Sequence, residues 1–180
     1  MGNNYHKLVL LAIFTAIASL LFLVENLIPK PLPFLRIGLA NILVILVLVL
    51  IGYKEALLIT VTKTVLGSFF SGLLFSPTII LSLGSSIVSL TIMFIALKSK
   101  ISFSLIGISI LGAFSHNAMQ LFLVYILLIK EVRIFYLFPV LSIIALISGF
   151  ITGIIAYTSY PKLKRSCDGV NTEAESIKER

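Results

Sequence analysis

The chain has 180 residues, of which 59% are hydrophobic and 12% are charged, and its mean hydropathy is +1.15. A soluble domain of this length could not bury so much apolar surface, so lipid must be the solvent for most of the chain. The net charge of +7 would suit nucleic acid in a soluble protein. Here it favours lipid headgroups instead, because Lys and Arg cluster at the ends of the apolar runs.

Six apolar runs follow one another, each close to the ~20 residues that cross a bilayer as a helix. No small-x-small cleavage site precedes Glu25, so the first run is expected to be an uncleaved span rather than a signal peptide. The predicted spans cover residues 8–28, 35–51, 56–75, 79–97, 103–129 and 134–158. The fold class is therefore an all-α integral membrane bundle of about six transmembrane helices over residues 1–160. Residues 161–180 are predicted to form a polar, disordered cytoplasmic tail.

Orientation follows from the basic residues in the short loops. One side carries seven of them: Lys7, Lys54, Lys98, Lys100, Lys162, Lys164 and Arg165. The other side carries four: Lys30, Arg36, Lys130 and Arg133. Seven against four predicts a multi-pass protein of the cell membrane with both termini in the cytoplasm.

The segment VENLIPKPLPFLRIGLAN, which begins at Val24, joins the first two spans. Its prolines at alternate positions forbid a helix and favour a stiff, extended crossing. Glu25 lies before the prolines, and Arg36 and Asn41 lie after them. With the predicted orientation, these residues occupy the outer half of the membrane, as do Ser85, His116, Asn117 and Gln120. Because lipid cannot satisfy such groups, a binding pocket that opens outward is predicted among them.

Two sets of polar residues each allow two interpretations. Lys63 inside the third span indicates either a ligand or ion-pair partner, with Glu25 as a possible partner, or a side chain that snorkels toward the inner interface. His116, Asn117 and Gln120, within the sequence SHNAMQ, indicate either ligand contact or ordinary hydrogen bonding between helices.

Small residues recur at the spacing of close helix packing, as in Ala12 with Ala16, Gly149 with Gly153, and more loosely Gly67 with Gly72. The sequence holds no phosphate loop, nucleophile elbow or metal-binding helix motif, and its only Asp is Asp168 in the tail. With one Cys and two widely separated His, neither a metal site nor a cofactor is expected.

The ordered motifs VENLIPKPLPFLRIGLAN, KTVLGSFFSGLLFSP, LSLGSSIVS and LGAFSHNAMQ resemble those of the Gx transporter family. Its members are also labelled heptaprenyl diphosphate synthase component I, and the resemblance covers residues 12 to about 156. Two positions depart from the family pattern: Lys63 stands where arginine is expected, and Ser85 stands where a second glycine is usual. The matching residues are Glu25, Pro29, Pro31, Gly38, Asn41, Gly67, Gly72, Gly84, Ser89, His116, Asn117 and Gln120.

The family is similar to the substrate-binding S components of energy-coupling factor transporters, which implies a six-helix bundle with an outward-facing pocket. It also implies that Ala12 and Ala16 dock a membrane coupling subunit driven by cytoplasmic ATPases. The candidate substrate-binding residues are Glu25, Arg36, Asn41, Lys63, Ser85, His116, Asn117 and Gln120. A prenyl synthase holds diphosphate through Mg²⁺ on aspartate-rich motifs, which this chain lacks, so it is not expected to be that catalytic subunit.

Three roles stay open. The first is substrate binding for a transporter of an unidentified small molecule. The second is a non-catalytic membrane partner in prenyl diphosphate or quinone metabolism, which would bind a lipid. The third is another kind of membrane protein, such as a subunit of an electron-transfer assembly. A wet pocket would support the first role, and an apolar slot open to lipid would support the second.

Overall fold

The structure is a computed structural model that describes residues 2–27, 38–101 and 103–178, and these residues form helices and connecting turns without any strand. The all-α prediction is therefore confirmed. The helices are α1 (Gly2–Leu27), α2 (Asn41–Leu50), α3 (Tyr53–Phe70), α4 (Pro77–Lys98), α5 (Leu105–Val124) and α6 (Phe138–Lys178). Between α5 and α6 lie a π-helical turn, η1 (Tyr125–Ile129), and a 3-10 helix, η2 (Val132–Leu137).

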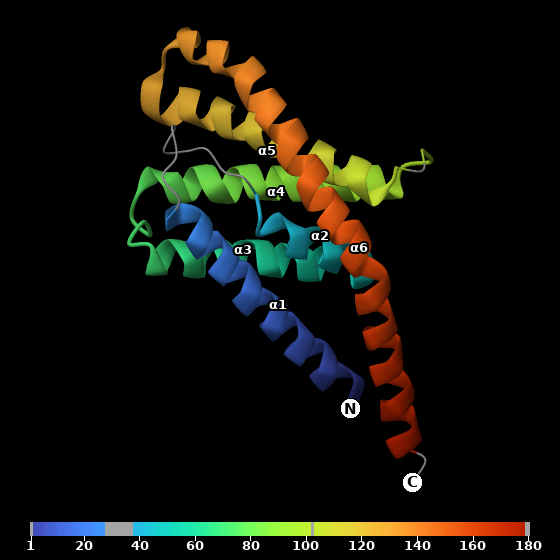
Figure 1. Ribbon diagram of the computed structural model, residues 1–180. Coiled ribbons are helices and arrows are strands. Elements are labelled where there is room, and N and C mark those ends of the chain that lie inside the picture. Colours follow the sequence, from blue (N-terminus) through green and yellow to red (C-terminus); the bar gives the residue numbers. More distant parts are fainter. Residues whose placement is uncertain (1, 28–37, 102, 179–180) are drawn as a thin grey trace.

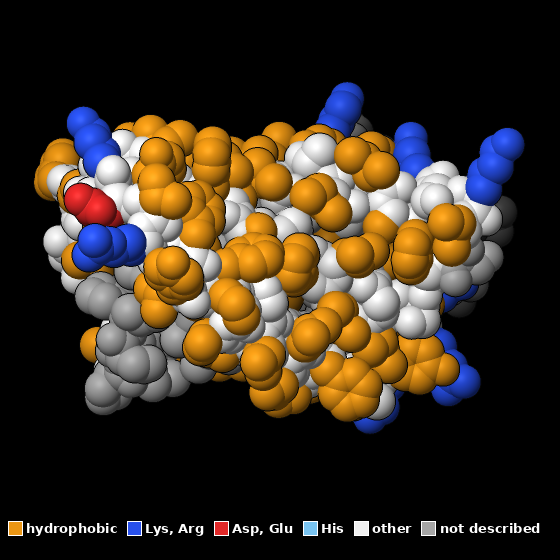
Figure 2. All heavy atoms as spheres, turned by 90° about the horizontal axis from the view of Figure 1, so that it is seen from above, with side chains coloured by type: hydrophobic (Ala, Val, Ile, Leu, Met, Phe, Trp, Pro, Cys, Tyr) orange, Lys and Arg blue, Asp and Glu red, His pale blue; other side chains and the backbone are white. Residues whose placement is uncertain are grey.

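The helices form an integral membrane bundle. Four segments within the described residues are long and apolar enough to cross a bilayer: Leu8–Leu27, Pro77–Lys98, Leu105–Ile129 and Val132–Arg165. Hydrophobic side chains cover most of the face shown in Figure 2, and Lys and Arg side chains project from its periphery. Such a surface suits lipid over its middle and headgroups or water at its edges.

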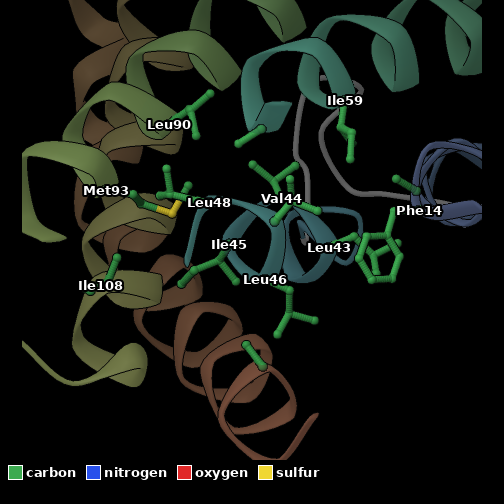
Figure 3. Packing of buried hydrophobic residues seen from close by; sticks show 14 of the residues in the cluster. Phe14, Leu43, Val44, Ile45, Leu46, Leu48, Ile59, Leu90, Met93 and Ile108 are labelled. Carbon is green, nitrogen blue, oxygen red and sulfur yellow. The ribbon is translucent and has the colours of Figure 1, made fainter. Parts of the chain in front are cut away.

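Helix α2 lies at the centre of the bundle, where it contacts α1, α3, α4 and α6. The outer helices contact one another in the order α1, α3, α4, α5 and α6, and α6 also contacts α1 (Figure 1). Six successive residues of α2, 43–48, are buried, and Figure 3 shows them reaching in several directions toward the surrounding helices. A helix that is apolar on every side can be covered by lipid or by protein, and the neighbouring helices cover α2.

The second predicted span is shorter than expected. The prediction of residues 35–51 is wrong in its extent, because α2 has ten residues and begins only at Asn41. Gly38 has a φ of +84°, which lies outside the helical range and favours glycine. At 1.5 Å per residue, α2 is about 15 Å long, roughly half the hydrocarbon thickness. It therefore begins inside the bundle, at Asn41, instead of spanning the membrane.

The turn between α3 and α4 follows its local sequence. Gly72 has a φ of +70°, and a Cβ added to it would meet no atom within 4 Å. The conformation of the turn, and not close helix packing, therefore explains this glycine. Ser76 is the N-cap of α4 and accepts a hydrogen bond from the Thr78 N–H, and Pro77 occupies the first helical position. Both choices are typical of helix starts.

Helix α6 continues as far as Lys178, so residues 161–178 of the segment that the sequence predicted to be disordered are helical, and residues 179–180 lie outside the described residues. Lys, Arg, Glu and Ala in this segment all have high helix propensity, which explains the continuation. Pro161 lies inside the helix, where it removes a backbone hydrogen bond and favours a bend. Figure 1 shows α6 changing direction along its length.

Helices α5 and α6 approach each other closely through two glycines. A Cβ at Gly149 would lie 2.7 Å from the Cα of Ile110, and one at Gly153 would lie 2.8 Å from the Cα of Ile106. These two glycines are four residues apart and face two α5 residues with the same spacing. The packing interpretation of Gly149 and Gly153 is therefore confirmed.

The contacts around the glycines predict that one added methyl group lowers the stability of the protein by different amounts at different positions. Gly149→Ala and Gly153→Ala should each destabilise the protein by about 1–3 kcal/mol, because backbone atoms block the new Cβ. Gly84→Ala is the matched control, since its Cβ would meet only the flexible end of Leu123, at 2.8 Å. Thermal unfolding in detergent measures the difference, and equal unfolding temperatures for all three variants would contradict this packing.

The orientation remains a prediction, and the structure supplies the sites to test it. Lys98 ends α4 before α5 begins, and Lys130 follows η1 at the other end of α5, and both side chains are exposed. Lys130→Cys should react with an impermeant thiol reagent from outside the cell, and Lys98→Cys should react only after permeabilisation. The reverse labelling would mean that both termini lie outside. Lys30, a further position for this test, lies outside the described residues.

Candidate functional site

A small polar cavity lies between α2, α4, α5 and α6. Its volume is about 20 Å³, which is room for roughly one water molecule. The described residues that line it are Gly38, Asn41, Ile45, Met93, Ser109, Gly112, Ala113, His116, Asn117, Ser148 and Thr152. No carboxylate is among them. Three of the predicted site residues, Asn41, His116 and Asn117, therefore meet at this one cavity.

Lys63 stands directly behind the cavity wall. Its side chain is only 2% exposed, and its ammonium group donates a 2.7 Å hydrogen bond to Oδ1 of Asn41. The snorkelling interpretation is therefore wrong, because the charge ends inside the bundle on a named partner. An ammonium at this depth is costly unless polar groups hold it, so Asn41 is part of the reason that the charge can stay there.

Glu25 holds the backbone just before α2. Its Oε1 accepts a 2.9 Å hydrogen bond from the N–H of Gly38, and its side chain is 3% exposed. A Cβ at Gly38 would lie 3.4 Å from Nδ2 of Asn41, so the Asn41 amide packs against this glycine. The start of α2 is therefore tied to α1 through Glu25 and to α3 through Lys63.

His116 connects α5 to α4. Its Nε2 lies 3.1 Å from Oγ of Ser85 and 3.5 Å from Oγ of Ser86. The Ser85 hydroxyl donates to the Leu81 carbonyl at 2.6 Å, so its oxygen is left to accept from His116. This arrangement places a proton on Nε2 of His116.

Asn117 connects α5 to the start of α6, because its amide nitrogen donates to the Leu141 carbonyl at 3.2 Å. His116 and Asn117 therefore bond between helices and also line the cavity, so both sequence interpretations of these residues have a structural basis. Gln120 is buried at 3% exposure but does not line the cavity, and Arg36 lies outside the described residues.

Sequence reasoning missed the hydroxyl groups that complete the cavity. Ser109 on α5 lies 2.9 Å from Thr152 on α6, oxygen to oxygen, and Thr152 also donates to the Ser148 carbonyl at 2.8 Å. The spacing of Ser148 and Thr152, four residues apart in an apolar helix, was the available signal. The signal is weak because such hydroxyls commonly bond to their own helix.

A second, apolar hollow lies on the surface beside the α3–α4 turn. Its volume is about 430 Å³, and it is lined by Leu74, Phe75, Ser76, Pro77, Ile79, Ile80 and Leu127. Phe75 is 98% exposed, so this hollow opens to whatever surrounds the protein. It differs from the inner cavity in both size and chemistry.

The described residues contain no group of three His, Cys, Asp or Glu side chains placed to hold a metal ion. Fold and site together define a helical membrane protein with a small buried cavity. Lys63 is held behind the wall of this cavity by its hydrogen bond to Asn41. The chain matches the family model described as heptaprenyl diphosphate synthase component I over residues 14–158. It therefore belongs to this family. No curated protein and no solved structure gives a significant match to it.

Proposed function

We propose that this protein is the substrate-binding membrane subunit of a transporter and has no catalytic activity of its own. The observation that carries the proposal is the polar cavity at the centre of an apolar bundle. Amide, imidazole and hydroxyl groups from three helices, α2, α5 and α6, converge there, and lipid can satisfy none of them. Groups of this kind at membrane depth typically mark the path or binding site of a polar substrate.

The proposal includes a coupling partner. The described residues show no nucleotide-binding loop, so the energy for substrate release must come from another subunit. Ala12 and Ala16 are both exposed on α1, while Ala18 beside them is fully buried. Exposure is what a docking surface requires, and alanines let another helix approach closely. Lipid is the alternative neighbour of this pair.

A second candidate follows from the family description and the apolar hollow beside the α3–α4 turn. Its aliphatic and aromatic lining suits a hydrocarbon chain. In this alternative the protein is a non-catalytic membrane partner in prenyl diphosphate metabolism. The compound retained by the gently purified protein discriminates between the two: a small polar molecule supports transport, and a prenyl lipid supports the alternative.

The first expected outcome concerns His116 and Asn117. His116→Ala or Asn117→Ala should remove the retained polar molecule, because each change deletes a cavity-lining group. The fold should survive, since lost polar contacts between spans cost about 0.6 kcal/mol on average. Mass spectrometry of the bound fraction and thermal unfolding measure the two effects. Ser142→Ala, which removes a hydroxyl bonded only to its own helix among the described contacts, is the control. If the variants fold and retain the molecule as the natural protein does, His116 and Asn117 only hold the helices together and do not bind the ligand.

The second expected outcome concerns Ala12 and Ala16. Ala12→Trp with Ala16→Trp should leave folding and retention of the molecule intact but abolish its uptake into cells, because two indoles would hold a partner helix away. The matched control is Ile143→Trp with Ile147→Trp, an equally spaced pair that is exposed on α6. Full uptake by the alanine-pair variant would exclude docking at this surface.

A further inference from the structure

Two charged side chains from different helices hold the first turn of α2. Glu25 on α1 accepts from the Gly38 N–H, and Lys63 on α3 donates to Oδ1 of Asn41. We call these four residues, Glu25, Gly38, Asn41 and Lys63, the α2 clasp. Both charged side chains are at least nine-tenths buried, so the clasp lies inside the bundle and not at a headgroup surface.

The clasp and the cavity share two residues. Gly38 and Asn41 belong to both, so the Lys63 ammonium stands one side chain behind the cavity wall. The described lining offers amide, hydroxyl and imidazole groups and no carboxylate. An anion in the cavity could accept hydrogen bonds from these groups and would be attracted by Lys63. A cation would meet no acidic group in the described lining, and the Glu25 carboxylate, which offsets part of the Lys63 charge, is held behind Gly38 by its N–H.

The cavity must enlarge before it can hold a metabolite, because about 20 Å³ holds only a water-sized molecule. Three of its walls are fixed to one another. Gly149 and Gly153 place α6 against the backbone of α5, and the Ser89 hydroxyl of α4 donates to the Gly112 carbonyl of α5 at 2.7 Å. These contacts make movement of α4, α5 and α6 relative to one another costly.

The fourth wall is α2, which is built differently. It has ten residues and lies between Gly38 at φ +84° and Gly52 at φ +144°. Apart from the clasp, its buried residues are aliphatic and pack without directional bonds. A short interrupted helix of this kind is a recurring feature of transporter binding sites. The first turn of α2 is therefore the wall most able to shift.

We propose that the α2 clasp recognises an acidic group of the substrate, a carboxylate or a phosphate. The acidic group takes the place of the Asn41 amide oxygen on the Lys63 ammonium. The released first turn of α2 then moves aside, and the cavity gains the room that the rest of the ligand needs. This inference rests on the proposed function, because it assigns the ligand class of the same cavity.

The test uses the full chain in detergent, with acetate, succinate, phosphate and diphosphate as separate probes and choline and glucose as non-acidic ones. Thermal unfolding is followed at constant ionic strength. Stabilisation that saturates with carboxylates alone, or with phosphates alone, identifies the acidic group. Lys63→Met should weaken the effective probe about tenfold or more, the loss typical of one hydrogen bond to a charged group. Lys63→Arg should keep the response, and Lys98→Met, which removes an exposed lysine at the end of α4, is the control.

A second variant keeps the inference testable if Lys63→Met does not fold. Asn41→Asp has nearly the shape of Asn41 but supplies a resident carboxylate to Lys63. It should unfold at a higher temperature than the natural protein without any probe and should no longer respond to acids. An Asn41→Asp variant that responds to acids like the natural protein would overturn the inference.

Other outcomes separate this inference from the proposed function. If the natural protein is stabilised by no acid but retains a neutral molecule that depends on His116 and Asn117, the binding function stands and the acidic ligand is wrong. If no probe binds and no molecule is retained, both proposals fail. Equal responses of Lys63→Met and Lys63→Arg to an acid would also exclude Lys63 as its counter-charge.

Discussion

The architecture depends on one constraint, which is that lipid satisfies no hydrogen-bonding group. Most buried hydroxyls in this bundle meet the constraint within their own helix, as Thr60 and Thr64 do by donating to carbonyls one turn earlier. The described residues leave no fully buried polar side-chain atom without a partner. Bonds between elements are fewer, and those of Glu25 and Lys63 meet at the first turn of α2. The buried side chains of Glu25 and Lys63 are therefore both held by hydrogen bonds at this turn.

The same constraint explains why α2 can be short. A helix in contact with lipid would need to reach both interfaces or expose its ends, but α2 is covered by its neighbours. At its start, the N–H groups of Asn41 and Ile42 donate to the carbonyls of Gly38 and Leu39, while Glu25 accepts from the Gly38 N–H and Lys63 donates to the Asn41 side chain. Irregular backbone at membrane depth is tolerated where protein surrounds it. The lengths of the outer helices must therefore match the thickness of the bilayer. The length of α2 need not, so α2 can form one wall of a cavity.

The sequence predicted the helices and much of the site, because apolar runs and isolated polar residues are strong signals in a membrane chain. Asn41, His116 and Asn117 do meet at one cavity. The true start of α2 was not predictable from the sequence, because the prediction relied on hydrophobicity and the apolar run continues through Gly38. The partner of Lys63 was missed for a related reason. The depth of each residue was estimated by assuming straight, full-length spans, and this assumption fails for Asn41, which begins a short central helix. Ser109, Ser148 and Thr152 gave only weak signals, because hydroxyls are common in apolar helices.

The family description raises the question of what a component of a prenyl synthase could do with this site. Mg²⁺ that holds a diphosphate is usually bound by one or two carboxylates together with the substrate phosphates. The acidic side chains that the structure describes are dispersed, with Glu25 held against Gly38, Glu55 in the first turn of α3 and Glu131 beyond η1. The inner cavity and the outer apolar hollow could each hold a molecule. Transport subunit and prenyl-lipid partner therefore differ in what is bound, and the polar groups that converge on α2 favour a ligand inside the bundle.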